Sequence, residues 1–182
     1  TALSFAANID PLFRGTARLA VADGEVEVEE ANFATLGLGN GLALKGGRFR
    51  SDIGYLNVQH PHEWDFADAP LMHKALFGAE GYRHDGLQLK WLAPTELFLQ
   101  FGAEIGRGDT FPGTDRNGSG AGAGAVFAKL GGDVGTAHAW QAGLSYLATR
   151  AADRAAHVED TDAAGPNEVE GLFTGRSRAW IA

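Results

Sequence analysis

The chain lacks cysteine and long apolar runs, and each absence limits what it can be. None of the 182 residues is cysteine, so disulfide bonds and thiolate metal sites are excluded. No run of about 18 apolar residues occurs, which excludes a membrane-spanning helix. A transmembrane β-barrel needs no such run, because its strands cross the bilayer as short segments of alternating polarity. Both water-soluble β proteins and transmembrane barrels therefore stay open.

Several motifs of known chemistry are missing as well. The sequence has no nucleophile elbow, no phosphate-binding loop, and no dinucleotide-binding glycine motif in a suitable context. We therefore predict that the chain is not an enzyme. Its formal net charge is -8 and no basic stripe is present, which argues against nucleic-acid binding.

What the sequence does contain is alternation of apolar and polar residues. Residues 87–91 and 97–105 each place leucine or another apolar residue at every second position. Between them lies Ala93-Pro94-Thr95, and a proline can set a turn angle but cannot donate to a strand ladder. The pattern predicts a β-hairpin whose two arms each have one apolar and one polar face.

The same alternation predicts about eight antiparallel strands and an all-β fold. The first run, residues 3–21, is read as one strand about twice as long as is needed to cross a bilayer. Glu30 and Asn32 interrupt the next strand, so a bulge or an extramembrane end is expected there. The Gly-Ala-rich residues 121–125 are expected to enter a strand whose small side chains leave room for a neighbouring segment. The predicted strands cover residues 3–21, 25–38, 42–49, 87–91, 97–105, 121–131, 138–148 and 171–182.

The connections between these strands alternate in length. Short turns are predicted at 39–41, 93–95 and 132–137, and long loops at 51–85, 107–120 and 149–170. Short turns on one rim and long loops on the other are typical of outer-membrane barrels. We therefore predict an antiparallel transmembrane β-barrel, with Trp91 and Trp140 in an aromatic girdle at the short, periplasmic rim. The alternative is a soluble antiparallel β-sandwich or closed barrel acting as a binding module.

The chain begins and ends inside predicted strands, so residues 1–182 are expected to be a single section of a larger barrel. In such a barrel the polar faces line the lumen. Basic side chains in a lumen favour passage of anions, whereas the alternative is that these groups pair across strands and hold the interior together. The predicted lumen residues are Arg14, Arg18, Gln88, Lys90, Gln100, Glu104, Arg176 and Arg178.

The long loop at 51–85 carries the richest chemistry. His60 and His62 flank Pro61, and imidazoles this close suit zinc or a similar divalent ion. Further ligands would come from Glu63, Asp65, His73 or His84. The other reading is a packed loop, folded inward or across the mouth as a constriction through Trp64, Phe66 and Pro70, with its histidines hydrogen-bonded to the backbone.

Several motifs carry a resemblance to a known family. They are Asn8-Ile9-Asp10, Phe13-Arg14-Gly15, Val28-Glu29-Glu30-Ala31, Leu44-Lys45-Gly46-Gly47-Arg48-Phe49, His60-Pro61-His62-Glu63-Trp64-Asp65-Phe66 and Trp91-Leu92-Ala93-Pro94-Thr95. They resemble a porin-like family of Gram-negative outer-membrane proteins that is distantly similar to phosphate-selective porins and is often labelled as zinc-regulated outer-membrane receptors.

The resemblance covers essentially the whole chain and implies a location in the outer membrane. The expected function is passive diffusion of small, anionic solutes, and the alternative is uptake or binding of zinc. The lipid bilayer, lipopolysaccharide and further copies of the chain in a homo-oligomer are the expected partners.

Overall fold

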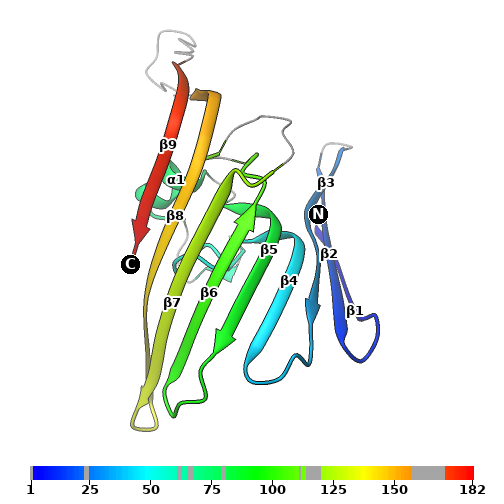
Figure 1. Cartoon of the computed structure of the whole chain (residues 1–182), viewed down its shortest axis with the longest axis vertical. Coiled ribbons are helices and arrows are strands. Elements are labelled where there is room, and N and C mark those ends of the chain that lie inside the picture. The colour runs from blue at the N-terminus through cyan, green and yellow to red at the C-terminus, as the bar shows by residue number, and fades with distance from the viewer. Residues whose placement is uncertain are drawn as a thin grey trace.

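The chain folds into one antiparallel sheet of nine strands (Figure 1). The computed structural model describes residues 2–22, 25–60, 63–64, 68–78, 81–110, 112–113, 120–156 and 171–182. Each strand pairs with the next one in sequence, so the sheet is a meander with β1 and β9 at its edges and is not closed. This confirms the predicted all-β, antiparallel fold. The strands are β1 Ala2–Asn8, β2 Phe13–Ala22, β3 Glu25–Thr35, β4 Leu42–Arg50, β5 Arg83–Leu92, β6 Phe98–Gly106, β7 Ala123–Val134, β8 His138–Ala156 and β9 Gly171–Ile181.

The predicted single strand over residues 3–21 is wrong, because the chain reverses inside it. β1 and β2 form a hairpin in which Asn8 lies opposite Arg14. The Asp10 side chain accepts hydrogen bonds from the backbone N–H groups of Leu12 and Phe13, at 2.7 and 2.8 Å. These hydrogen bonds stabilise the turn between β1 and β2. Because the turn divides the predicted strand in two, the sheet has nine strands and not the predicted eight.

Two local predictions for β3 and its following turn are confirmed. The register between β2 and β3 shifts after Arg18, so Glu29 has no direct partner and forms the bulge expected near Glu30. The turn at 39–41 has positive φ at all three residues, 76°, 52° and 75°. Glycine and asparagine tolerate this conformation best, which explains the Gly39-Asn40-Gly41 sequence.

The two rims of the sheet differ as the sequence predicts. Residues 9–12, 36–41, 93–97 and 135–137 make the connections on one rim. The other rim carries the connection at 23–24 and the three long ones, 51–82, 107–122 and 157–170. Two of the long connections are shorter than predicted, because β5 begins at Arg83 and β8 continues to Ala156, while the one at 107–122 is slightly longer.

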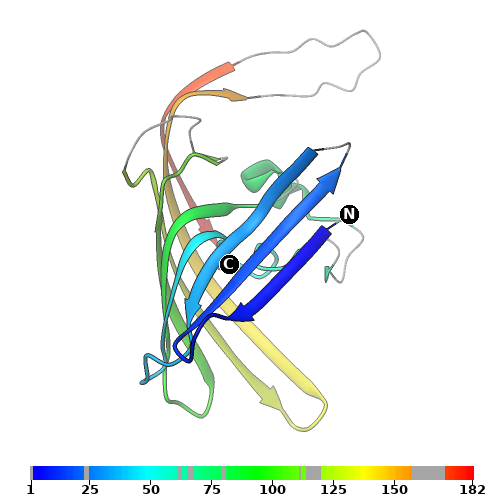
Figure 2. The ribbon, with the colours of Figure 1, turned by 90° about the vertical axis from the view of Figure 1, so that its right-hand side faces the viewer.

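The sheet is curved, and its two faces differ in chemistry (Figure 2). Side chains alternate between the faces along every strand. The convex face carries exposed apolar residues on most strands, while the concave face carries polar and charged ones. Convex residues with more than a third of their surface exposed include Leu3, Phe5, Val26, Phe33, Leu42, Leu87, Leu89, Trp91, Phe101, Ile105, Val126, Leu144 and Trp180.

The segment between β4 and β5 folds back into the concave side of the sheet, as one of the two sequence-based readings expected (Figure 2). It contains a short helix, α1 (Leu71–Phe77), which the sequence did not predict. The buried side chains of the segment pack on small and apolar residues of β7 and β8. The alanines at the start of β7 therefore leave room for a neighbouring segment, as predicted. The packed residues are Ile53, Phe77 and Tyr82 from the segment, and Ala123, Ala125 and Leu147 from the wall. No helix within the described ranges is long and apolar enough to cross a membrane.

Candidate functional site

Glu104 joins the folded-back segment to the sheet. Its carboxylate accepts hydrogen bonds from the Ser51 hydroxyl, from the backbone N–H of Asp52 at 2.8 Å, and from Gln88 Nε2 at 2.7 Å. His84 Nε2 lies 3.3 Å from Glu104 Oε2, and both side chains are fully buried. A buried carboxylate needs several donors to offset its lost hydration, and these groups supply them. We call Ser51, Asp52, His84, Gln88 and Glu104 the Glu104 cluster.

A second contact joins the same segment to β3. His60 Nε2 lies 3.5 Å from Glu30 Oε1, and the two side chains are 9% and 18% exposed. The Trp64 indole N–H donates to the Leu56 carbonyl at 3.3 Å, which closes the segment on itself. The segment is thus attached to the sheet at β3 as well as at β6.

Three lysines lie on the concave face beside the Glu104 cluster. Lys90 Nζ is 2.9 Å from Asp52 Oδ2, and the charges of Lys90, Asp52 and Glu104 act on both Lys45 and Lys129. All three lysines are partly exposed, whereas Asp52 and Glu104 are 4% and 5% exposed. The charge that a solute can reach on this part of the wall is therefore positive. We call Lys45, Lys90 and Lys129 the lysine group.

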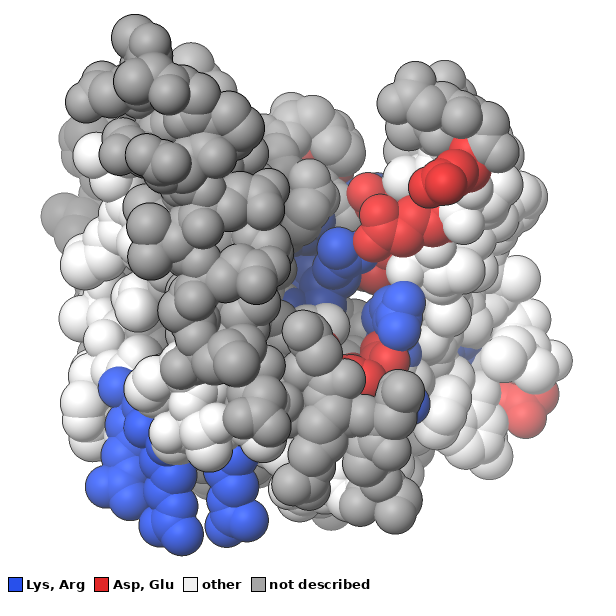
Figure 3. Space-filling view, turned by 90° about the horizontal axis from the view of Figure 1, so that it is seen from above, with Lys and Arg blue, Asp and Glu red and all other residues white. Residues whose placement is uncertain are grey.

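Lys129 of the lysine group borders open space. A hollow of about 790 Å³ is lined by Lys129, by Gly54 and Tyr55 of the folded-back segment, and by Gly143 and Ser145 of β8. Seen from above, charged side chains of both signs lie between the walls of the curved sheet (Figure 3). A small hydrated ion fits a space of this size beside the lysine.

Most of the predicted lumen residues share the concave face. Gln88 lies opposite Glu104 and Gln100 opposite Lys129, while Arg18 donates to Ser4 at 3.0 Å beside Glu30. The residues on this face are Arg14, Arg18, Gln88, Lys90, Gln100 and Glu104. The sequence missed Lys45 and Lys129, although both alternate with apolar neighbours in the same way as Lys90 does.

Arg176 and Arg178 lie on the convex face, so the prediction that they share a face with Gln88 and Lys90 is wrong. Arg178 is opposite Ala148 and Arg176 is opposite Arg150, in the same row of side chains as the pair Tyr146 and Trp180. All three arginines are exposed. The small residues of β9, Gly175, Ser177 and Ala179, face the concave side instead, opposite the buried Leu147 and Thr149 of β8.

The predicted metal ligands have separate partners in the described residues. His60 contacts Glu30, and His84 contacts Glu104. Glu63 accepts from the His60 backbone N–H at 3.3 Å. Within the described parts of the chain, no three histidine or acidic side chains gather as a metal site. His62 and Asp65, like Phe66 of the packed-loop reading, lie outside those parts, so the zinc site stays a prediction.

His73, another predicted ligand, packs among aromatic rings. Its ring centre lies 5.9 Å from that of Trp64 and 5.2 Å from that of Phe77. Neither ring nitrogen has a hydrogen-bond partner within the described ranges. Burial, together with the nearby positive charge of Arg50, lowers the pKa of His73 below its usual 6.5.

This gives a prediction for pH. Because the pKa of His73 is lower in the folded segment than in the released one, release binds protons. Packing of α1 is therefore expected to be fully stable above pH 6.5 and to weaken as the pH falls through the range just below it. Hydrogen exchange of the α1 amides at pH 7.5 and 5.5, corrected for intrinsic rates, measures this. His73→Phe should reduce the pH dependence, because the contacts of His60 with Glu30 and of His84 with Glu104 remain, and equal pH dependence in both proteins would contradict the prediction.

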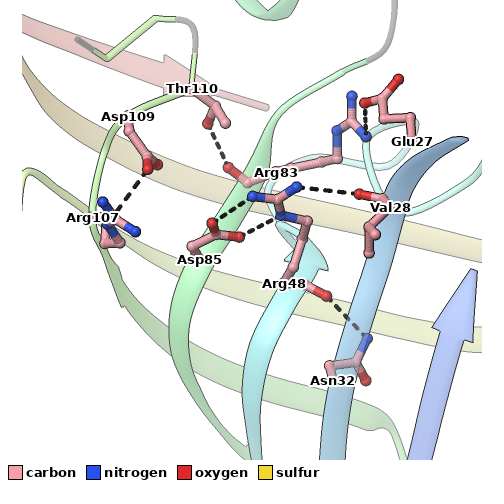
Figure 4. A network of polar contacts seen from close by, with 9 residues as sticks. All are labelled: Glu27, Val28, Asn32, Arg48, Arg83, Asp85, Arg107, Asp109 and Thr110. Atoms are coloured by element: carbon pink, nitrogen blue, oxygen red, sulfur yellow. Dashed lines mark hydrogen bonds and ion pairs between the residues drawn. The ribbon is translucent and has the colours of Figure 1, made fainter. Parts of the chain in front are cut away.

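A network of ion pairs covers the long-loop rim of β3, β4 and β5 (Figure 4). Arg48 donates from Nε and Nη2 to the two oxygens of Asp85, each at 2.7 Å, and from Nη1 to the Val28 carbonyl at 3.2 Å. Arg83 lies 3.1 Å from Glu27, and Arg107 lies 3.4 Å from Asp109. Each of these rim arginines has its own carboxylate partner.

Comparison with known proteins gives limited help. No protein-family model and no solved structure matches the chain. An uncharacterized protein of Aquifex aeolicus (strain VF5) is 44% identical over 103 residues, which are 57% of this chain and 22% of that protein. The matched segment thus spans about a fifth of the length of that relative.

Proposed function

We propose that this chain is a section of a transmembrane β-barrel through which small, anionic solutes diffuse. The observation that carries the proposal is the separation of the two faces of the sheet. Most strands present apolar side chains on the convex face, and Leu87, Leu89 and Trp91 of β5 are 50%, 47% and 41% exposed there. Exposed apolar area this extensive is unusual on a protein surrounded by water and matches a lipid-facing wall.

The concave face supports the second half of the proposal. It carries Gln88, Lys90, Gln100 and Glu104 at alternate positions, as in a water-filled lumen. The folded-back segment occupies part of this space and acts in the proposal as a constriction. Where it leaves room, the lysine group supplies reachable positive charge, which raises the local concentration of anions.

The rims support an orientation in an outer membrane. The three longest connections lie on one rim, and Trp91 and Trp140 lie near the other, where they are 41% and 40% exposed. Tryptophans are enriched at the interface between lipid and water. In the proposal the short rim faces the periplasm, and the convex face contacts lipid.

A charge placed on the convex face tests the proposal. Leu89 lies in the middle of the apolar row on β5, between Leu87 and Trp91. Leu89→Arg is expected to lower the free energy of unfolding in bilayers by about 2–4 kcal/mol, because the guanidinium would sit in hydrocarbon. Urea unfolding of the full-length protein in lipid vesicles measures this.

The matched control is Gln100→Arg, which adds the same charge to the concave face of β6. It should cost clearly less than Leu89→Arg, since the half-buried position opposite Lys129 faces the water-filled side of the sheet and not hydrocarbon. Equal costs for the two variants would refute the lipid-facing assignment. So would recovery of the full-length protein from cells without detergent.

A further inference from the structure

We propose that the convex surface of β8 and β9 binds the phosphate groups of lipid A, the bisphosphorylated glycolipid of lipopolysaccharide. This inference rests on the proposed membrane function and names one lipid that the wall would recognise. It starts from three arginines that the function above does not use. Arg150, Arg176 and Arg178, which we call the outer arginine group, occupy two neighbouring positions on one face of the paired strands.

The geometry of this group is set by the register. Arg150 and Arg176 are directly opposite each other, and Arg178 lies two residues further along β9, opposite Ala148. Opposite side chains in a sheet are about 5 Å apart at Cβ, so like charges there repel. Ala148 leaves open space beside Arg178. A cluster of basic side chains is visible on this part of the outer surface (Figure 3).

The outer arginine group differs from the rim arginines in its ion pairs. Arg48, Arg83 and Arg107 each lie within 3.4 Å of a carboxylate. In the described part of the chain, no carboxylate forms an ion pair with the outer arginine group, and all three side chains are exposed. Three close, exposed positive charges attract anions, and guanidinium groups bind phosphate through two parallel hydrogen bonds.

The neighbouring residues place this group at the depth of lipid headgroups. Next in the same row, toward the short rim, come Tyr146 and Trp180, whose ring centres are 4.7 Å apart. Trp180 is 69% exposed. Arg150 lies ten residues along β8 from Trp140, about the length of strand that crosses a bilayer, so with Trp140 at the periplasmic interface the arginines lie level with the phosphate groups of the opposite leaflet. They also lie toward the long-loop rim, the outer side in the proposed orientation, where lipopolysaccharide is found.

Binding of lipid A to the full-length protein in detergent micelles, followed by native mass spectrometry, tests the inference. The triple variant Arg150→Gln, Arg176→Gln, Arg178→Gln should bind bisphosphorylated lipid A about tenfold more weakly or worse, because several charge-assisted hydrogen bonds are lost. Arg107→Gln, a rim arginine outside the group, should bind as the unsubstituted protein does. Lipid A with both phosphates removed should bind the unsubstituted protein as weakly as the triple variant binds intact lipid A.

Three outcomes would overturn the inference: equal affinity of the unsubstituted and triple-variant proteins, an equal loss in Arg107→Gln, or binding of phosphatidylglycerol as tight as that of lipid A. If the triple variant does not fold, the corresponding Arg→Lys variant keeps the charges and loses the paired hydrogen bonds, so weaker binding is still expected. Channel conductance should be unchanged in either variant, because the group lies outside the lumen. Absence of a channel in the unsubstituted protein would refute the proposed function and leave the lipid measurement valid.

Discussion

Glu104→Ala is expected to release the folded-back segment and to raise the conductance of the channel several-fold. The substitution removes the acceptor for Ser51, for the Asp52 backbone and for Gln88, and it leaves His84 without its carboxylate. All of these groups are buried, so the loss is expected to cost about 3–5 kcal/mol of unfolding free energy, because three hydrogen bonds to a buried carboxylate are lost and their donors stay unpaired. Single-channel recording in planar bilayers and urea unfolding of the full-length protein measure the two effects.

Two variants control for this prediction. Glu104→Gln keeps an oxygen for the Asp52 N–H and loses the charge facing His84, so its effects should be smaller. Gln100→Ala removes a polar group from the same face of β6, outside the Glu104 cluster, and should change the conductance far less than Glu104→Ala does. If Glu104→Ala has the conductance of the unsubstituted protein, the segment either does not constrict the lumen or is held elsewhere, for example by His60 and Glu30.

Alternation of polarity predicted the strands from β3 onward. It did not reveal the turn between β1 and β2, because the alternation continues through that turn. Residues 9–12 form a connection of four residues, so the odd positions stay apolar on both sides of it. Period two therefore continues through the hairpin, and the run looks like one strand. The available signal was Asp10-Pro11, a turn pair, since Asp10 accepts the two N–H groups that close the turn.

The error in β9 has a different cause. Gly175, Ser177 and Ala179 alternate with Arg176 and Arg178, and the sequence favoured small residues outside and arginines inside. The register with β8 reverses this, because the small residues meet Leu147 and Thr149 under the folded-back segment. Pairing between strands is a long-range property, and the polarity of one strand does not determine it.

The folded-back segment was predictable in outline and not in detail. Its aromatic and proline content indicated a packed loop, and residues of the segment do pack against Ala123 and Ala125. The helix α1 has no acidic residue in its first turn and no side-chain cap, so the usual start signals are absent. Its position depends on the wall that it contacts. Likewise, Lys45 and Lys129 come together with Lys90 only through the pairing of four strands.

Removing the lysine group is expected to abolish anion preference. In the triple variant Lys45→Gln, Lys90→Gln, Lys129→Gln, the reachable positive charge beside the hollow is lost, while Asp52 and Glu104 stay in place. The ratio of anion to cation permeability should fall about tenfold, since three partly screened charges contribute on the order of 1 kcal/mol or more to the energy of an anion. The reversal potential under a potassium chloride gradient across a planar bilayer gives this ratio directly.

The matched control uses arginines on the opposite face. Arg176→Gln with Arg178→Gln removes two positive charges that the register places outside the lumen, so the reversal potential should not change. A shift in this control would mean that β9 presents its arginines to the passage in the full-length protein. If the lysine variant keeps the reversal potential of the unsubstituted protein, the lysine group does not select ions. Selectivity would then come from parts of the wall outside this sheet.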